Sequence, residues 1–178
     1  MSGDRYFAFL RAINTGGRRL TNDSLLAPFR EFGFTDVAAY QAAGNVTFRS
    51  TGVVGEASIE AVLADAYGFE TPTFVRATAD VSAIAVAQPF TDDELAGTAG
   101  KVQVAFLRRV STPEALDQLG ELIPDEDQVR VIGREWYWLP VDGISASTLP
   151  VAKVERVLGE MTIRTLGTVQ RLSAKYSE

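Results

Sequence analysis

The sequence predicts an α+β protein of two tandem ferredoxin-like halves, each with the order β-α-β-β-α-β and an antiparallel sheet, plus a linker helix and a C-terminal helix. Two observations predict this fold. The same succession of strand and helix patterns occurs twice along the 178 residues, and residues 8–11 (AFLR) recur at residues 105–108. The repeated order and the repeated motif together indicate a duplication.

The first half, residues 1–77, begins with an aromatic-rich apolar run, which is typical of a buried strand. Apolar residues at helical spacing follow, and Gly33 and Gly68 are suited to end two helices. Pro28 predicts either an early-turn position in the first helix or a kink. The expected elements are a strand at residues 6–10, a helix at 25–32, strands at 37–40 and 45–49 joined by a hairpin at 41–44, a helix at 59–67 and a strand at 73–76.

The second half, residues 101–178, repeats this order. Thr112 followed by Pro113 predicts a helix start, because Thr caps free backbone N–H groups and Pro fits the first helical position. Residues 78–100 are expected to form a linker helix and a loop, and the whole chain is expected to form one compact body. The other expected elements are strands at residues 102–107, 128–132, 135–139 and 161–163, and helices at 151–158 and 166–176.

The chain contains neither Cys nor His, which excludes disulfides, thiolate zinc sites, cysteine nucleophiles and any Ser-His-Asp triad. The consecutive acids Asp125, Glu126 and Asp127 lack the spacing of metal ligands, so we expect a solvated turn there, no metal site and no cofactor. There is no basic-then-apolar leader and no apolar run of roughly 18–20 residues, so we expect a cytoplasmic protein without a membrane partner.

Charge is distributed unevenly along the chain. The formal net charge is −6, which argues against a general nucleic-acid binder. Residues 51–127 carry 4 basic and 14 acidic side chains, whereas residues 1–50 carry 6 basic and 4 acidic ones. Residues 128–178 carry 7 basic and 5 acidic side chains. A local basic patch is therefore compatible with the net negative charge of the whole chain.

The most unusual segment is residues 11–19 (RAINTGGRR), which follows a strand and precedes a helix. Adjacent glycines let the backbone approach a ligand closely, and a helix start offers N–H groups to an anion. The segment matches neither a P-loop nor a dinucleotide fingerprint. It indicates an anion site, and the plainer interpretation is a loop with solvated arginines.

The topology predicts a second segment beside this loop. In a β-α-β-β-α-β unit, the loop after the first strand and the hairpin after the second strand lie at the same end of the sheet. The two segments offer hydrogen-bond donors, one aromatic ring and no carboxylate, which suits a phosphate, a carboxylate or a stacked base. The plainer interpretation of the Gly-Asn pair is hairpin chemistry. The predicted ligand-binding residues are Arg11, Asn14, Gly16, Gly17, Arg18, Arg19, Tyr40, Gln41, Gly44 and Asn45.

An aromatic strand offers a different kind of surface. Trp136 and Trp138 share one face of the strand at residues 135–139, and Tyr137 takes the other face. In the plainer interpretation, the two tryptophans pack in a core. In the alternatives, they stack a ligand or form a contact between copies of the chain.

Three groups of motifs resemble a known bacterial family. They are residues 9–17 (FLRAINTGG), residues 33–37 (GFTDV) with 44–48 (GNVTF), and residues 162–169 (TIRTLGTV). In this order, and over nearly the whole chain, they resemble the family called domain of unknown function 1697. The resemblance implies a duplicated α+β fold in a bacterial protein, and it implies no known activity.

The sequence departs from the family pattern at three places. The family favours Gln-Ser where Ala42 and Ala43 stand, Ser-Lys-Leu where residues 147–149 are STL, and Arg-Asn-Trp where residues 164–166 are RTL. Each change removes a polar or aromatic group that could contact a ligand. The resemblance therefore implies that any ligand chemistry of the family is weakened or altered in this chain.

Three hypotheses for function follow. The first is a protein that binds a small anion, a nucleotide or a short nucleic acid at the Gly-Gly/Arg loop. The alternative is a structural or regulatory homo-oligomer, such as a homodimer, without catalysis. The third is an Arg-based enzyme that handles phosphoryl groups. Because the chain lacks His and Cys, the base of such an enzyme would have to be Asp, Glu, Lys or Tyr, and the sequence singles out no catalytic residue among them.

Overall fold

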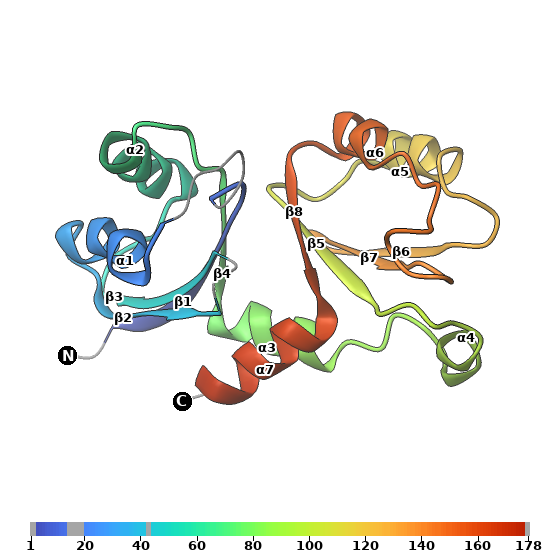
Figure 1. Ribbon diagram of the computed structural model, residues 1–178, viewed down its shortest axis with the longest axis horizontal. Helices are drawn as coiled ribbons and strands as arrows, with labels where there is room; N and C mark the ends of the chain where they lie inside the picture. The colour runs from blue at the N-terminus through green and yellow to red at the C-terminus, as the bar shows by residue number, and fades with distance from the viewer. Residues whose placement is uncertain (1–2, 14–19, 42–43, 177–178) are drawn as a thin grey trace. The chain divides into compact units, whose positions relative to one another are not determined.

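The computed structural model describes residues 3–13, 20–41 and 44–176. The chain divides into two compact units, of which the first ends at Ser82 and the second runs from Ala83 to Tyr176. Each unit contains one four-stranded sheet with helices on one face (Figure 1).

The first unit contains the predicted β-α-β-β-α-β order, followed directly by a further helix. Its elements are β1 (Asp4–Leu10), α1 (Asn22–Glu31), β2 (Thr35–Tyr40), β3 (Asn45–Ser50), α2 (Glu56–Tyr67) and β4 (Thr73–Ala77). The further helix, α3 (Thr78–Val86), begins in this unit and continues past Ser82 into the second unit.

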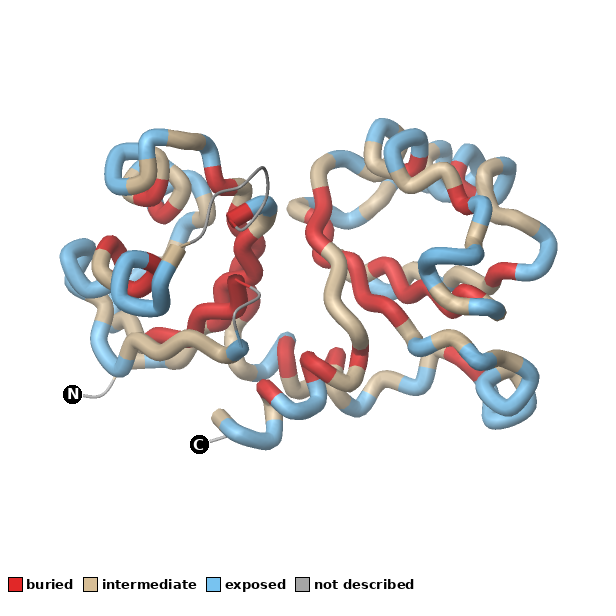
Figure 2. Tube along the Cα trace, in the orientation of Figure 1, coloured by how far each residue is buried: buried red, intermediate tan, exposed pale blue. Residues whose placement is uncertain are grey.

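The first sheet has the strand order β2-β3-β1-β4, and all its pairs are antiparallel. Phe9 in β1 pairs with Asn45 of β3 on one side and with Phe74 of β4 on the other. Alternate residues of the strands face α1 and α2 and belong to the core of this unit. Figure 2 colours long stretches of these strands as buried. Burying one large apolar side chain contributes about 1.5–3 kcal/mol to the stability of the folded state. The buried core of this unit consists of Ala8, Leu10, Ile13, Leu25, Leu26, Phe29, Val46, Phe48, Ile59, Leu63 and Val75.

The two helices of this unit begin and end at chemically suited residues. Thr21 caps α1, because its hydroxyl accepts a hydrogen bond from the backbone N–H of Ser24 at 3.1 Å. α2 ends at Gly68, whose φ of +72° lies in the left-handed region that glycine tolerates. Pro28 lies in the interior of α1 at a buried position, past its first turn.

Carboxylates of α2 contact the outer edge of β4. The backbone N–H groups of Thr73 and Val75 donate to Glu60 and Glu56, at 2.7 and 2.9 Å respectively. Glu56 also lies 3.8 Å from the fully buried guanidinium of Arg76. These contacts join the helix layer to the sheet through hydrogen bonds to charged acceptors, which are stronger than those between neutral groups.

The second unit repeats the arrangement. Its elements are α4 (Asp92–Ala96), β5 (Gln103–Leu107), α5 (Pro113–Gly120), β6 (Gln128–Ile132), β7 (Glu135–Leu139), α6 (Val151–Leu158), β8 (Met161–Thr165) and α7 (Leu166–Tyr176). The strand order is β6-β7-β5-β8, again antiparallel throughout, with α5 and α6 over one face (Figure 1).

The pairing registers of the two units correspond residue by residue. Phe7 of β1 pairs with Arg76 of β4, and Val104 of β5 pairs with Arg164 of β8. The repeated AFLR motif follows directly after Phe7 in one unit and after Val104 in the other. The predicted α+β fold with two similar βαββαβ halves is therefore confirmed.

Trp136 and Trp138 belong to the core beneath α5 and α6. Their rings stack 6.0 Å apart with an interplanar angle of 4°, and both side chains are buried. The hypothesis that these tryptophans form a contact between copies of the chain is therefore wrong. Tyr137 takes the other face of the strand, where burial and then the charge of Glu135 raise its pKa to about 12.

The segment between the two halves contains one helix that the sequence did not predict. α4 interrupts the expected loop at residues 88–100, and it has a complete capping box. The Thr91 hydroxyl accepts from the Glu94 N–H at 3.2 Å, and the Glu94 carboxylate accepts from the Thr91 N–H at 2.7 Å. Over the described ranges of the chain, no helix is both long and apolar enough to span a membrane.

Asp127 is buried, so the expected solvated turn at residues 125–127 is wrong at its last position. Its carboxylate accepts hydrogen bonds from the Trp138 indole N–H at 2.9 Å, from the Val141 backbone N–H at 3.3 Å and from the Ser147 hydroxyl. The carboxylate thus holds the segment after β7 against the strand that carries the tryptophans.

We expect Asp127→Asn to lower the free energy of unfolding by about 2 kcal/mol, because an amide N–H₂ must then face one of three donors. Urea unfolding followed by tryptophan fluorescence measures the change. The matched control is Asp125→Asn in the same turn, where the side chain is exposed and the expected change is within about 0.5 kcal/mol. Equal effects of the two substitutions would show that the carboxylate of Asp127 does not organise this segment.

Candidate functional site

Three segments of the first unit meet at the end of β1. The backbone N–H of Leu10 donates to the carbonyl of Gly44 at 2.7 Å, and the N–H of Arg11 donates to the carbonyl of Pro72 at 2.9 Å. The first bond connects β1 with the turn between β2 and β3, and the second connects it with the segment that enters β4. We call this place the β1 rim, defined by Leu10, Arg11, Gly44 and Pro72.

Gly44 is required at the β1 rim for two reasons. Its φ is +73°, a conformation that side chains with a Cβ disfavour. A Cβ at this position would lie 3.0 Å from the Leu10 carbonyl oxygen and 3.0 Å from Ile13 Cδ1. Glycine therefore allows the turn to lie directly against the chain that leaves β1.

Asn45 is used by the turn itself. The residue is buried, and its side-chain amide donates to the Tyr40 carbonyl at 3.2 Å. This bond closes the connection between β2 and β3 across the intervening residues. The geometry agrees with hairpin chemistry as the main role of the Gly-Asn pair.

Two residues with a Cβ have positive φ beside this rim. Ala12 has a φ of +58° and Gln41 has a φ of +57°. Such values are uncommon for residues other than glycine, and strained backbone of this kind is concentrated at functional sites. Gln41 is exposed in the β2–β3 turn. Arg11, which precedes Ala12 in the sequence, is half-buried.

The structure describes half of the predicted binding residues. Arg11, Tyr40, Gln41, Gly44 and Asn45 lie at the end of β1 or at the β2–β3 turn. The other predicted residues lie outside the described residues, as do the departures from the family pattern at residues 42 and 43. They are Asn14, Gly16, Gly17, Arg18 and Arg19.

Two other arginines of the first sheet share one carboxylate. Arg5 donates to Asp36 through its guanidinium and to the Thr47 hydroxyl at 3.1 Å. Arg49 Nε lies 3.5 Å from the same carboxylate of Asp36. The sequence did not reveal this cluster, because Asp36 lies far along the chain from both arginines.

Arg164 occupies the position in β8 that Arg76 occupies in β4. Its guanidinium donates to the Thr162 hydroxyl at 3.0 Å and to the Ile163 carbonyl at 2.8 Å. Arg76 likewise donates to the carbonyl of the residue before it, at 2.9 Å. Burial lowers the pKa of Arg164 to about 10, so the side chain is still a cation at neutral pH.

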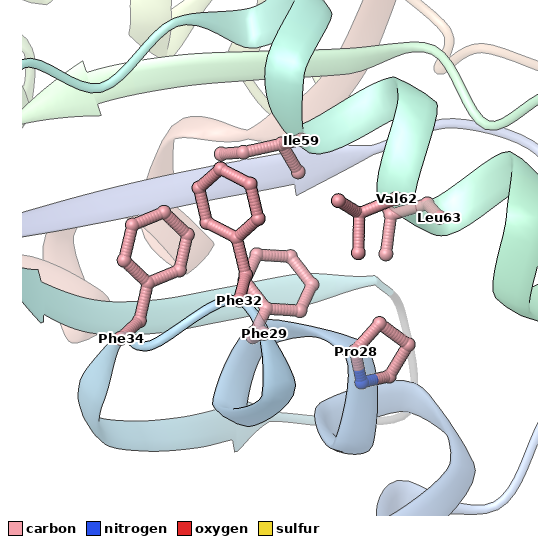
Figure 3. Close-up of a pocket in the computed structure, with 7 residues that line it drawn as sticks. All are labelled: Pro28, Phe29, Phe32, Phe34, Ile59, Val62 and Leu63. Carbon is pink, nitrogen blue, oxygen red and sulfur yellow. The ribbon is translucent and has the colours of Figure 1, made fainter.

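An apolar pocket also opens between the end of α1 and α2. Figure 3 shows side chains of the two helices directed toward one another, with none that carries a charge. The space between them is too small for a water molecule, so it is a seam of the core rather than a ligand site. Its lining residues are Pro28, Phe29, Phe32, Phe34, Ile59, Val62 and Leu63.

Metal-ligand geometry is not found in the described part of the chain, where no three acidic side chains converge. The β1 rim instead combines backbone strain, a glycine in close contact and an arginine at the end of a strand. The guanidinium group of an arginine is the kind of donor that binds phosphate or carboxylate oxygens.

Comparisons with known proteins place the chain among proteins without an assigned activity. A family model described as "Protein of unknown function (DUF1697)" matches residues 4–137. The solved structure of a conserved bacterial protein from Streptococcus pneumoniae is similar, with a TM-score of 0.66 and 16% sequence identity, over 96% of this chain and 97% of that chain. This likeness shows the fold alone. No curated protein matches the chain.

We expect Gly44→Ala to destabilise the first unit more than Gly68→Ala. Both glycines have nearly the same φ, +73° and +72°, so both substitutions incur the left-handed strain of about 1–2 kcal/mol. Only Gly44 faces close atoms, whereas nothing lies within 4 Å of a Cβ at Gly68. The crowding adds roughly 1–3 kcal/mol, which urea unfolding of the two variants measures. Equal losses would contradict the close contact between the turn and the end of β1.

Proposed function

We propose that this chain, which belongs to the DUF1697 family of proteins of unknown function, binds a small phosphate-bearing anion at the β1 rim. The ligand would be inorganic phosphate, a nucleotide or the backbone of a short nucleic acid. The observation that carries the proposal is the 2.7 Å hydrogen bond from Leu10 to Gly44. It brings the start of the arginine-rich segment at residues 11–19 to the β2–β3 turn.

The composition of the segment supports an anionic ligand. Residues 11–19 contain three arginines and no acidic residue, in a chain whose net charge is −6. Arginine presents a rigid fork of donors that matches phosphate and carboxylate oxygens. Gly16 and Gly17 have no side chains to keep a ligand from the main-chain N–H groups.

Arg11 is the residue on which the proposal rests most directly. Its backbone N–H donates to Pro72, so its Cα is fixed at the point where the chain leaves β1. A fixed arginine loses less conformational entropy when it binds a ligand than one on an unanchored chain. The alanines at positions 42 and 43 offer no polar side chain to the ligand, so we expect weak binding.

We expect replacement of both Arg11 and Asn14 by Ala to weaken the binding of AMP or inorganic phosphate at least about tenfold, which corresponds to about 1.4 kcal/mol. Isothermal titration calorimetry measures the dissociation constant. The matched control is Arg109→Ala, which removes one exposed positive charge from the second unit and should change the affinity less than about twofold. Circular dichroism confirms that each variant is folded.

The salt dependence of binding separates the two kinds of ligand. Binding of a short single-stranded oligonucleotide should weaken steeply with salt, because several phosphates release counterions. Binding of AMP should show a shallow dependence. The proposal fails if neither probe binds, if the double variant binds as the natural chain does, or if Arg109→Ala causes the same loss.

A second candidate is a homo-oligomer that assembles through β6. This strand is an edge of the second sheet, and Ile132 at its end is 50% exposed. Exposed strand edges with apolar side chains are suited to pairing with another chain. In this case, light scattering should give a mass near twice 19.3 kDa, and Ile132→Lys should lower it. A mass equal to one chain in the natural protein would reject this candidate.

A further inference from the structure

The second unit contains a cleft of about 520 Å³ that is independent of the β1 rim. This volume lies within the range of roughly 300–1,000 Å³ that is usual for small-molecule sites. The lining combines an apolar wall with a few polar side chains. Its residues are Ala87, Gln88, Pro89, Phe90, Thr91, Asp92, Leu95, Val102, Leu166 and Gln170.

Hydrogen bonds hold the walls of the cleft together. The backbone N–H of Leu166 donates to the Val102 carbonyl at 2.9 Å, which joins the start of α7 to the segment before β5. The Gln170 side chain donates to the Ala85 carbonyl at 3.3 Å, which joins α7 to α3. The cleft is therefore formed before a ligand enters, and a ligand does not have to order its walls.

Charges around the cleft are largely compensated. Arg130 donates to Glu94 at 2.9 Å, and its guanidinium carbon lies 5.5 Å from the centre of the Phe90 ring. The Thr91 backbone N–H, aided by Arg130, lowers the pKa of Glu94, so this carboxylate remains ionised and paired. Among the lining residues that the structure describes, Asp92 is then the one formally charged side chain.

The lining selects by chemistry as well as by size. Pro89, Leu95 and Val102 offer apolar surface to the body of a ligand, whereas Gln88 and Gln170 offer amide groups. A carboxylate attracts a cation and repels an anion, also at an exposed side chain such as Asp92. We propose that this cleft binds a small organic amine with an apolar or aromatic body, whose ammonium group faces Asp92.

Three compounds with the same phenol ring test this assignment. Tyramine is a cation at pH 7, N-acetyltyramine is neutral and 4-hydroxyphenylacetate is an anion. We expect tyramine to bind at least about fivefold more tightly than N-acetyltyramine, and the anion to bind least. Titration by two-dimensional ¹⁵N NMR of the full chain should shift amide signals of residues 87–95 and 166–170. Absence of such shifts at 10 mM tyramine would overturn the proposal.

Matched variants identify the charged group. Asp92→Asn should reduce the affinity for tyramine at least about fivefold, to the level of N-acetyltyramine. The control is Asp93→Asn, one residue further along α4 and outside the lining, which should change the affinity for tyramine less than twofold. Val102→Trp should obstruct part of the cleft and weaken the shifts for all three compounds. Equal effects of the two aspartate substitutions would reject Asp92 as the partner of the amine. None of these outcomes depends on phosphate binding in the first unit.

Discussion

The first strand of each half is paired on both edges, and the remaining geometry depends on this double pairing. β1 lies between β3 and β4, and β5 lies between β7 and β8. Because both edges of such a strand are hydrogen-bonded to neighbours, the chain leaves the sheet at the end of the strand, beside the ends of the two neighbouring strands. In the first unit, the chain after Leu10 consequently meets the β2–β3 turn. The hydrogen bond to Gly44 and the need for glycine at that position both follow from this crossing.

Local sequence signals were sufficient for most elements of the fold. β6 and β7 begin and end where alternation predicted, because Gly133 and Arg134 leave room only for a tight turn, and Gly133 has a φ of +61°. α7 spans Leu166–Tyr176 as its apolar spacing predicted. The boundaries of these elements can be predicted locally, because the turn residues and the helical spacing lie within the segment itself.

Features that depend on distant partners were not predictable in the same way. Asp127 has the same local composition as its acidic neighbours, and only the folded chain brings the Trp138 indole and the Ser147 hydroxyl to it. α4 is five residues long, too short for an apolar period, so its capping box was the one available signal. For the candidate site, the sequence indicated the turn glycine and the arginine after β1. It did not indicate that Arg5 and Arg49 share Asp36, because the partners lie on three different strands.

The contacts of Glu56 and Glu60 with β4 have a consequence for the behaviour of the protein at high concentration. The backbone N–H groups of Thr73 and Val75 are already occupied, so an approaching polypeptide finds no donors there to copy the sheet. The opposite edge, β2, has an irregular register between Thr35 and Ala38, which interrupts its row of hydrogen-bonding groups. The first unit is thus a poor template for fibre growth at both edges. We therefore expect an intermolecular sheet to start more readily at an edge of the second unit.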